Sequence, residues 1–154
     1  PQVIYVQDLL DEWLGKAAAR VILPITDPYV VHHGALGGFG TAYLPKGADR
    51  ADIIARLAAR PELLEVISRE EAVSRYDLPA DRIGDIVMIS TENMTIGTSE
   101  HRHDLAALNE PLRSHGGLTE QEVPFIVNRV MDLPNGAGLR NFDAFFVATT
   151  AAAL

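Results

Sequence analysis

The sequence predicts an α+β fold, and three observations support this class. Short β-branched and aromatic runs occur between residues 21 and 97, and amphipathic stretches alternate with them. Two of these amphipathic stretches begin at residues that cap helices well. An antiparallel sheet with helices on one face would bury the apolar side of all these elements in one small module.

The first expected element is an amphipathic helix over residues 3–15. Apolar side chains recur at near-helical spacing from Ile4 to Leu14, and acidic residues fill the other face. Gly15 is a good helix stop. We expect the apolar face of this helix to pack on a core.

Residues 21–23 and 29–31 are predicted strands, because they are β-branched or aromatic and prolines bend the chain beside them. The glycine-rich residues 34–40 then turn the chain into a strand at 41–44. These glycines lack the spacing of a dinucleotide-binding loop. A strand also follows them, where that loop would open a helix.

A helix is predicted over residues 48–60. Its apolar stripe is flanked by alanines, Asp49 or Asp52 serves its N-terminus, and Pro61 ends it. Residues 63–67 then form a short strand.

A second capped helix follows this strand. Ser68 and Glu71 have the spacing of a capping box, and the helix runs to about Tyr76. After a loop, an apolar strand is predicted at 83–91, and a further short one at 93–97.

The chain is predicted to close with a strand and a helix. Residues 123–127 are an apolar run that Pro124 restricts to a sheet edge or a strand start. After a turn at 132–136, Asn141 can cap a final helix over residues 141–153 that carries phenylalanines and alanines.

Composition narrows the classes of function. The 154 residues, 47% apolar and 22% charged, suit one globular domain, and we expect neither a membrane anchor nor a signal peptide. With no cysteine, a metal would need His, Asp or Glu ligands, and the composition fits a cytoplasmic protein. The net charge of -8 argues against nucleic acid or an anionic membrane as partner. An anionic substrate would need local arginines or a metal.

Several histidines are candidate metal ligands. Residues 98–118 show little hydrophobic periodicity and form a long connection. Connections of this length are more typical of functional segments than of simple linking loops. His101 and His103 would share a face if extended, but nothing nearby completes a tetrahedral set. His32 and His33 are adjacent, so a regular strand would point them to opposite faces.

His115 is the sharpest candidate. Gly116 and Gly117 follow it, so no bulky side chain stands beside the backbone and a metal ion or anion can approach closely. Thr119 and Glu122 then have capping-box spacing.

The sequence segments around His115 resemble those of a known family. Residues 114–124 (SHGGLTEQEVP) resemble the closing segment of the alkaline-phosphatase superfamily of two-zinc phosphohydrolases. Residues 5–15 (YVQDLLDEWLG), 82–87 (RIGDIV), 102–105 (RHDL) and 110–115 (EPLRSH) narrow the resemblance to the phosphonoacetate hydrolase family, which cleaves a carbon–phosphorus bond. The resemblance covers nearly the whole chain, but it is to the C-terminal part of a longer enzyme.

This resemblance implies a division of the chain. Residues 1–16 would be a helix that packs on an α/β catalytic core, and residues 17–97 an inserted antiparallel α+β cap module. Residues 98–154 would return to the core with the metal-ligand loop, a strand and the final helix.

The resemblance also implies the site residues. A complete active site would hold two Zn²⁺ ions, and His115 would be the one ligand from this chain. The threonine nucleophile and the other ligands would lie in N-terminal segments of the same enzyme, so no catalytic residue is expected here. Arg113 is a candidate for orienting the anionic substrate, and Arg20 is another of the same type.

The leading hypothesis is therefore the C-terminal part of a zinc-dependent phosphonoacetate hydrolase that is inactive alone. Its partners would be a small anionic phosphonate and the rest of the enzyme, with a homodimer left open. The alternatives are a nucleotide pyrophosphatase or phosphodiesterase of the same superfamily and a non-catalytic α+β module that binds a small ligand.

Overall fold

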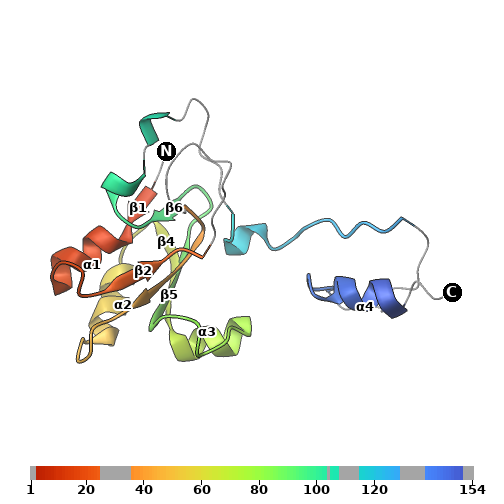
Figure 1. The fold of residues 1–154 in the computed structure, drawn as a ribbon, viewed down its shortest axis with the longest axis horizontal. Coiled ribbons are helices and arrows are strands. Elements are labelled where there is room, and N and C mark those ends of the chain that lie inside the picture. The colour runs from red at the N-terminus through yellow and green to blue at the C-terminus, as the bar shows by residue number, and fades with distance from the viewer. Residues whose placement is uncertain (1–2, 25–35, 104, 108–114, 129–137, 151–154) are drawn as a thin grey trace. The chain divides into compact units, whose positions relative to one another are not determined.

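A computed structural model describes residues 3–24, 36–103, 105–107, 115–128 and 138–150 of the chain. The chain forms two compact units, Pro1–Glu122 and Val123–Leu154. Helices occur together with parallel and antiparallel strands, so the predicted α+β class is confirmed (Figure 1). No helix in the described ranges is long and apolar enough to cross a membrane.

The larger sheet of the first unit has four antiparallel strands in the order β2-β3-β5-β4. These strands are β2 (Arg20–Ile22), β3 (Phe39–Tyr43), β4 (Leu63–Ser68) and β5 (Ile86–Ser90). They confirm four of the predicted strands with shifted ends. The strand predicted at 29–31 lies outside the described residues.

Both predicted cap-and-helix pairs are confirmed. In α2 (Arg50–Ala58), the Asp49 carboxylate accepts a hydrogen bond from the Asp52 backbone N–H at 3.1 Å. In α3 (Arg69–Tyr76), Ser68 Oγ accepts from the Glu71 N–H at 3.2 Å. Asp49 is thus the residue that caps the first of these helices.

The prediction that the helices cover one face of the sheet is wrong. Ile86 and Met88 of β5 belong to the core cluster that includes side chains of α1 and α2. Val87 faces the other way, into a cluster with Ile67 and Ala72 of α3. Because β5 is apolar at consecutive positions, both of its faces need cover, so helices lie on both.

The start of the chain also differs from its prediction. A strand, β1 (Val3–Tyr5), precedes a shorter helix, α1 (Val6–Leu14). β1 pairs in parallel with β6 (Thr95–Gly97), and the two form a separate sheet in which Ile4 lies opposite Ile96 (Figure 1). The helix prediction failed over the first residues because the β-branched Val3 and Ile4 also suit a strand, and a distant partner was available.

The residues after β6 form short turns of 3₁₀ helix at η1 (Glu100–Arg102), η2 (Leu105–Ala107) and η3 (Leu118–Glu120). The capping box predicted from Thr119 to Glu122 does not form. Glu120 instead accepts a hydrogen bond from the Gly117 N–H at 3.0 Å. The same three-residue spacing is used two residues earlier, because the turn begins at Gly117 and not at Thr119.

In the second unit, the strand predicted at 123–127 is absent, and Ile126 is 88% exposed. Pro124 has no N–H to donate, and no described strand pairs with this run. The final helix is present as α4 (Asp143–Thr150). The Asp143 carboxylate, rather than the expected Asn141 side chain, accepts a hydrogen bond at its start, from the Arg140 N–H at 2.7 Å.

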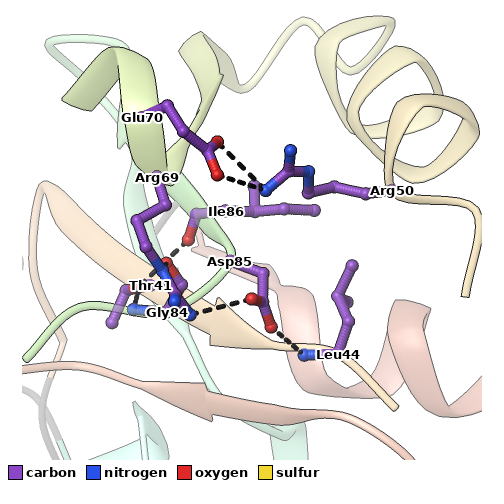
Figure 2. A network of polar contacts seen from close by, with 8 residues as sticks. All are labelled: Thr41, Leu44, Arg50, Arg69, Glu70, Gly84, Asp85 and Ile86. Carbon is purple, nitrogen blue, oxygen red and sulfur yellow. Dashed lines mark hydrogen bonds and ion pairs between the residues drawn. The ribbon is translucent and has the colours of Figure 1, made fainter. Parts of the chain in front are cut away.

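One carboxylate joins three elements of the larger sheet (Figure 2). Asp85, just before β5, accepts from the Leu44 N–H at the end of β3 at 2.8 Å. Its other oxygen accepts from Arg69 Nη2 of α3, also at 2.8 Å. This contact holds α3 and the end of β3 to the start of β5.

The buried Thr41 gives a stability prediction. Its hydroxyl donates to the Ile86 carbonyl at 2.9 Å and accepts from the Gly84 N–H at 2.7 Å (Figure 2). Thr41→Val keeps the shape but leaves the Gly84 N–H without its acceptor and removes the hydroxyl's bond to the Ile86 carbonyl, so the free energy of unfolding should fall by about 2 kcal/mol in urea melts. Thr91→Val is the control, since its hydroxyl lies 3.4 Å from the Glu62 carbonyl. Equal losses in the two variants would contradict this reading.

Candidate functional site

The backbone of His115 is tied to the point where β3 begins and β5 ends. Gly38 donates its N–H to the His115 carbonyl at 2.9 Å, and the Gly38 carbonyl accepts from the Ser90 N–H at 2.9 Å. The preceding Gly37 exchanges two backbone hydrogen bonds with Ile96 of β6, at 2.8 and 3.3 Å. His115 therefore lies where both sheets of the first unit meet.

Glycines let the chain pass this point. A Cβ on Gly38 would lie 2.6 Å from the Gly117 nitrogen and 2.9 Å from its Cα. Gly116 has a φ of 96°, a conformation that residues with a Cβ rarely adopt. The close approach expected of Gly116 and Gly117 is thus made by the Gly38 backbone, and approach by a metal stays a prediction.

The His115 side chain is exposed, and within the described ranges its ring forms no hydrogen bond or ion pair. Among the same residues, no three His, Asp or Glu side chains are placed to hold one metal ion. An exposed imidazole without a hydrogen bond in the described ranges fits a single ligand in a site that other residues complete.

The alternative histidine pair is not arranged as a metal site. His103 is 6% exposed, its Nε2 accepts from the Thr98 N–H at 3.1 Å, and its ring stacks on Tyr5 with centroids 6.0 Å apart. That lone pair is therefore not available to a metal, while His101 lies exposed in η1. Burial also raises the pKa of the Tyr5 phenol. The histidines at 32–33 lie outside the described residues.

The two arginines predicted to orient the substrate are placed differently. Arg113 lies outside the described residues. Arg20 is exposed on β2 and pairs with Tyr43 at the far end of β3 from Gly38. Five strand residues separate those ends, which corresponds to about 16 Å. The structure does not bring Arg20 to the His115 backbone, and its contact with substrate stays a prediction.

A groove that the sequence did not suggest surrounds Arg20. Lys16, Arg20, Ser99 and Arg102 all contribute to its lining. The sequence carried one signal for this groove, because Lys16, Arg20 and Arg102 are cations in a chain with a net negative charge. They meet only because β1 pairs with β6, and that pairing was not predicted.

Comparison with known proteins identifies close relatives among solved structures. No protein-family model matches the sequence. Two crystal structures of phosphonoacetate hydrolase from Sinorhizobium meliloti 1021, one in complex with phosphonoformate and one with phosphonoacetate, match at 76% sequence identity. Their TM-scores are 0.87 and 0.86, and each match covers 99% of this chain but 37% of the solved chain.

The prediction that the chain matches only part of a longer enzyme is therefore confirmed. The match extends over the two sheets and over the His115 segment, because it leaves almost no residue of the chain uncovered. The chain is thus similar over almost its whole length to phosphonoacetate hydrolase, and it spans 37% of the length of that solved relative.

Proposed function

We propose that the chain is part of a zinc-dependent phosphonoacetate hydrolase, which converts phosphonoacetate and water into acetate and phosphate. The observation that carries this proposal is the 76% identity with the solved hydrolase along 99% of the chain. The relative was crystallised with phosphonoacetate and with phosphonoformate, so small phosphonates are the substrate class to test first.

We infer that His115 is the ligand that this chain contributes to one zinc ion. Its exposed ring, with no hydrogen bond inside the described ranges, supports this role. The backbone bond from Gly38 fixes the position of the residue without using the side chain. A ligand held in this way keeps its lone pair and loses little freedom when metal binds.

The reaction sets demands that this role would help to meet. A P–O bond forms, the C–P bond breaks, and the departing carbon keeps the electron pair and takes up a proton. When bound, zinc supplies charge that polarises the phosphoryl oxygens and favours the ionised nucleophile. Of this chain's residues, His115 would hold that charge in place, and Arg113 would orient the anionic substrate.

The proposal requires the rest of the enzyme. Described residues provide one candidate ligand and no group of three, so we infer that the 154 residues alone do not hydrolyse phosphonates. We further propose that the four-stranded sheet, which lies within residues 17–97, covers the active site as a cap.

A substrate panel on the intact enzyme that carries these residues tests the proposal. Phosphate release should be fastest with phosphonoacetate, should stop with a chelator and should return with zinc. Nucleotide pyrophosphates and phosphodiesters serve as the comparison substrates. Faster cleavage of those esters would place the enzyme in the alternative class, and no turnover of any substrate would favour a binding module.

A further inference from the structure

A groove of about 670 Å³ lies beside α1, between the turn that leads into β2 and the residues that follow β6. Its volume is in the range of small-molecule sites, roughly 300–1,000 Å³. Three cationic side chains line it, Lys16, Arg20 and Arg102, together with one carboxylate, Asp11. Three positive charges against one negative charge favour an anionic ligand.

A glutamine positions the first wall of this groove. The Gln7 amide oxygen accepts from the Val21 N–H at 2.8 Å, and its nitrogen donates to the Ala19 carbonyl at 3.0 Å. Ala19 and Val21 are 5% and 6% exposed. Because strand side chains alternate, the intervening Arg20 points away from that core, on the exposed side that lines the groove.

Asp11 fixes the turn that carries Lys16. One Asp11 carboxylate oxygen accepts from Gln7 Nε2 at 2.7 Å and from the Ala17 N–H at 3.1 Å. Ala17 has a φ of 58°, which residues with a Cβ rarely adopt. The carboxylate therefore has a structural role, and two donors already occupy this oxygen.

The opposite wall includes a serine. Ser99 is 4% exposed as a whole residue, lines the groove, and its hydroxyl forms no hydrogen bond with the described residues. The hydroxyl is therefore available as a donor to a ligand in the groove. Backbone bonds from Gln7 to Thr98 and from Glu100 to the Asp8 carboxylate, both at 2.9 Å, hold this wall to α1.

The groove cations lack carboxylate partners. Within the described ranges, Lys16, Arg20 and Arg102 form no ion pair. Most other described arginines do pair with Asp or Glu, namely Arg50, Arg56, Arg60, Arg69, Arg75 and Arg82. Three cations without ion pairs in the described ranges thus line one groove, beside a hydrogen-bonded wall.

We propose that this groove binds a dianion of phosphoryl or phosphonyl type, with Arg20 and Arg102 as its main ligands. Guanidinium groups bind such oxyanions through paired N–H donors, and the Ser99 hydroxyl would supply one more. Lys16 adds charge at the rim. The groove runs along β2 and on to Leu23, and His115 is not among its lining residues, so we treat it as a site distinct from the proposed zinc site.

Nuclear magnetic resonance titration of the ¹⁵N-labelled intact enzyme that carries these residues, freed of metal with a chelator, tests this proposal. Inorganic phosphate, added at constant ionic strength, should shift the amides of Ala17, Arg20 and Ser99 to saturation. Arg20→Gln and Arg102→Gln should each raise the dissociation constant for phosphate about tenfold, because each substitution removes one charged donor. Phosphonoacetate is titrated in parallel. The anion with the lower dissociation constant shows whether the groove prefers free phosphate or a phosphonate.

Controls separate this site from non-specific charge effects and from the zinc proposal. Arg82→Gln, at an exposed arginine outside the groove, should leave the titration unchanged, and so should His115→Ala. Shifts that do not saturate, that chloride reproduces, or that survive the Arg20 and Arg102 substitutions would overturn the proposal. Equal binding of malonate would overturn the assignment to phosphoryl anions.

Discussion

In the intact enzyme, His115→Ala is expected to lower phosphate release from phosphonoacetate by about 100-fold or more and to remove about half of the bound zinc. The substitution deletes the only imidazole that the described part of the chain presents with a free ring beside the sheet junction. The backbone bond from Gly38 stays, so the fold should persist. Metal analysis by mass spectrometry and a phosphate assay measure the two effects.

His101→Ala is a matched control, because His101 is also an exposed histidine in the same connecting segment. It should keep full zinc content and activity. If His115→Ala retained both zinc ions and normal turnover with an unchanged melting curve, His115 would not be a ligand. No residue of this chain would then support the proposed zinc chemistry.

Local chemistry explains which elements were predictable. Asp49 and Ser68 each accept a hydrogen bond from the N–H three residues later, and that pattern is contained in a few consecutive residues. The strands around them are β-branched runs with clear limits. Such elements need no knowledge of distant partners.

The failed predictions share a dependence on distant partners. Ile4 fits a helical stripe by spacing, but it becomes part of a strand because Ile96 lies beside it in parallel. Residues 123–127 fit a strand by composition, yet no described strand pairs with them. In both cases the deciding contact is made by residues far along the chain or by none in the described ranges.

The same limit applies to the candidate sites. His115 could be selected from its neighbours Gly116 and Gly117, because a metal-ligand loop can be a local pattern. The use of those glycines could not be predicted, since it depends on Gly38. The groove around Arg20 was not predicted, because its two walls come from residues 7–23 and 98–102, which are far apart in the sequence.

Gly38→Ala tests whether this backbone contact positions the His115 segment. Its φ lies outside the left-handed region, so alanine is compatible with the local backbone. The new Cβ would lie 2.6 Å from the Gly117 nitrogen, so residues 115–117 must move. We expect the zinc affinity of the intact enzyme to fall about 10- to 100-fold, and the free energy of unfolding by about 1–3 kcal/mol. Chelator competition and urea melts measure them.

Gly138→Ala is the control, because a Cβ at that glycine meets no atom within 4 Å and its φ also lies outside the left-handed region. Loss of stability in Gly38→Ala with unchanged zinc affinity would mean that the contact supports the fold but does not position the metal ligand. Loss of zinc affinity in Gly38→Ala but not in Gly138→Ala, with the imidazole still present, would show that zinc ligation depends on where β3 holds residues 115–117. His115→Ala cannot make that distinction, because it removes the ligand and its position together.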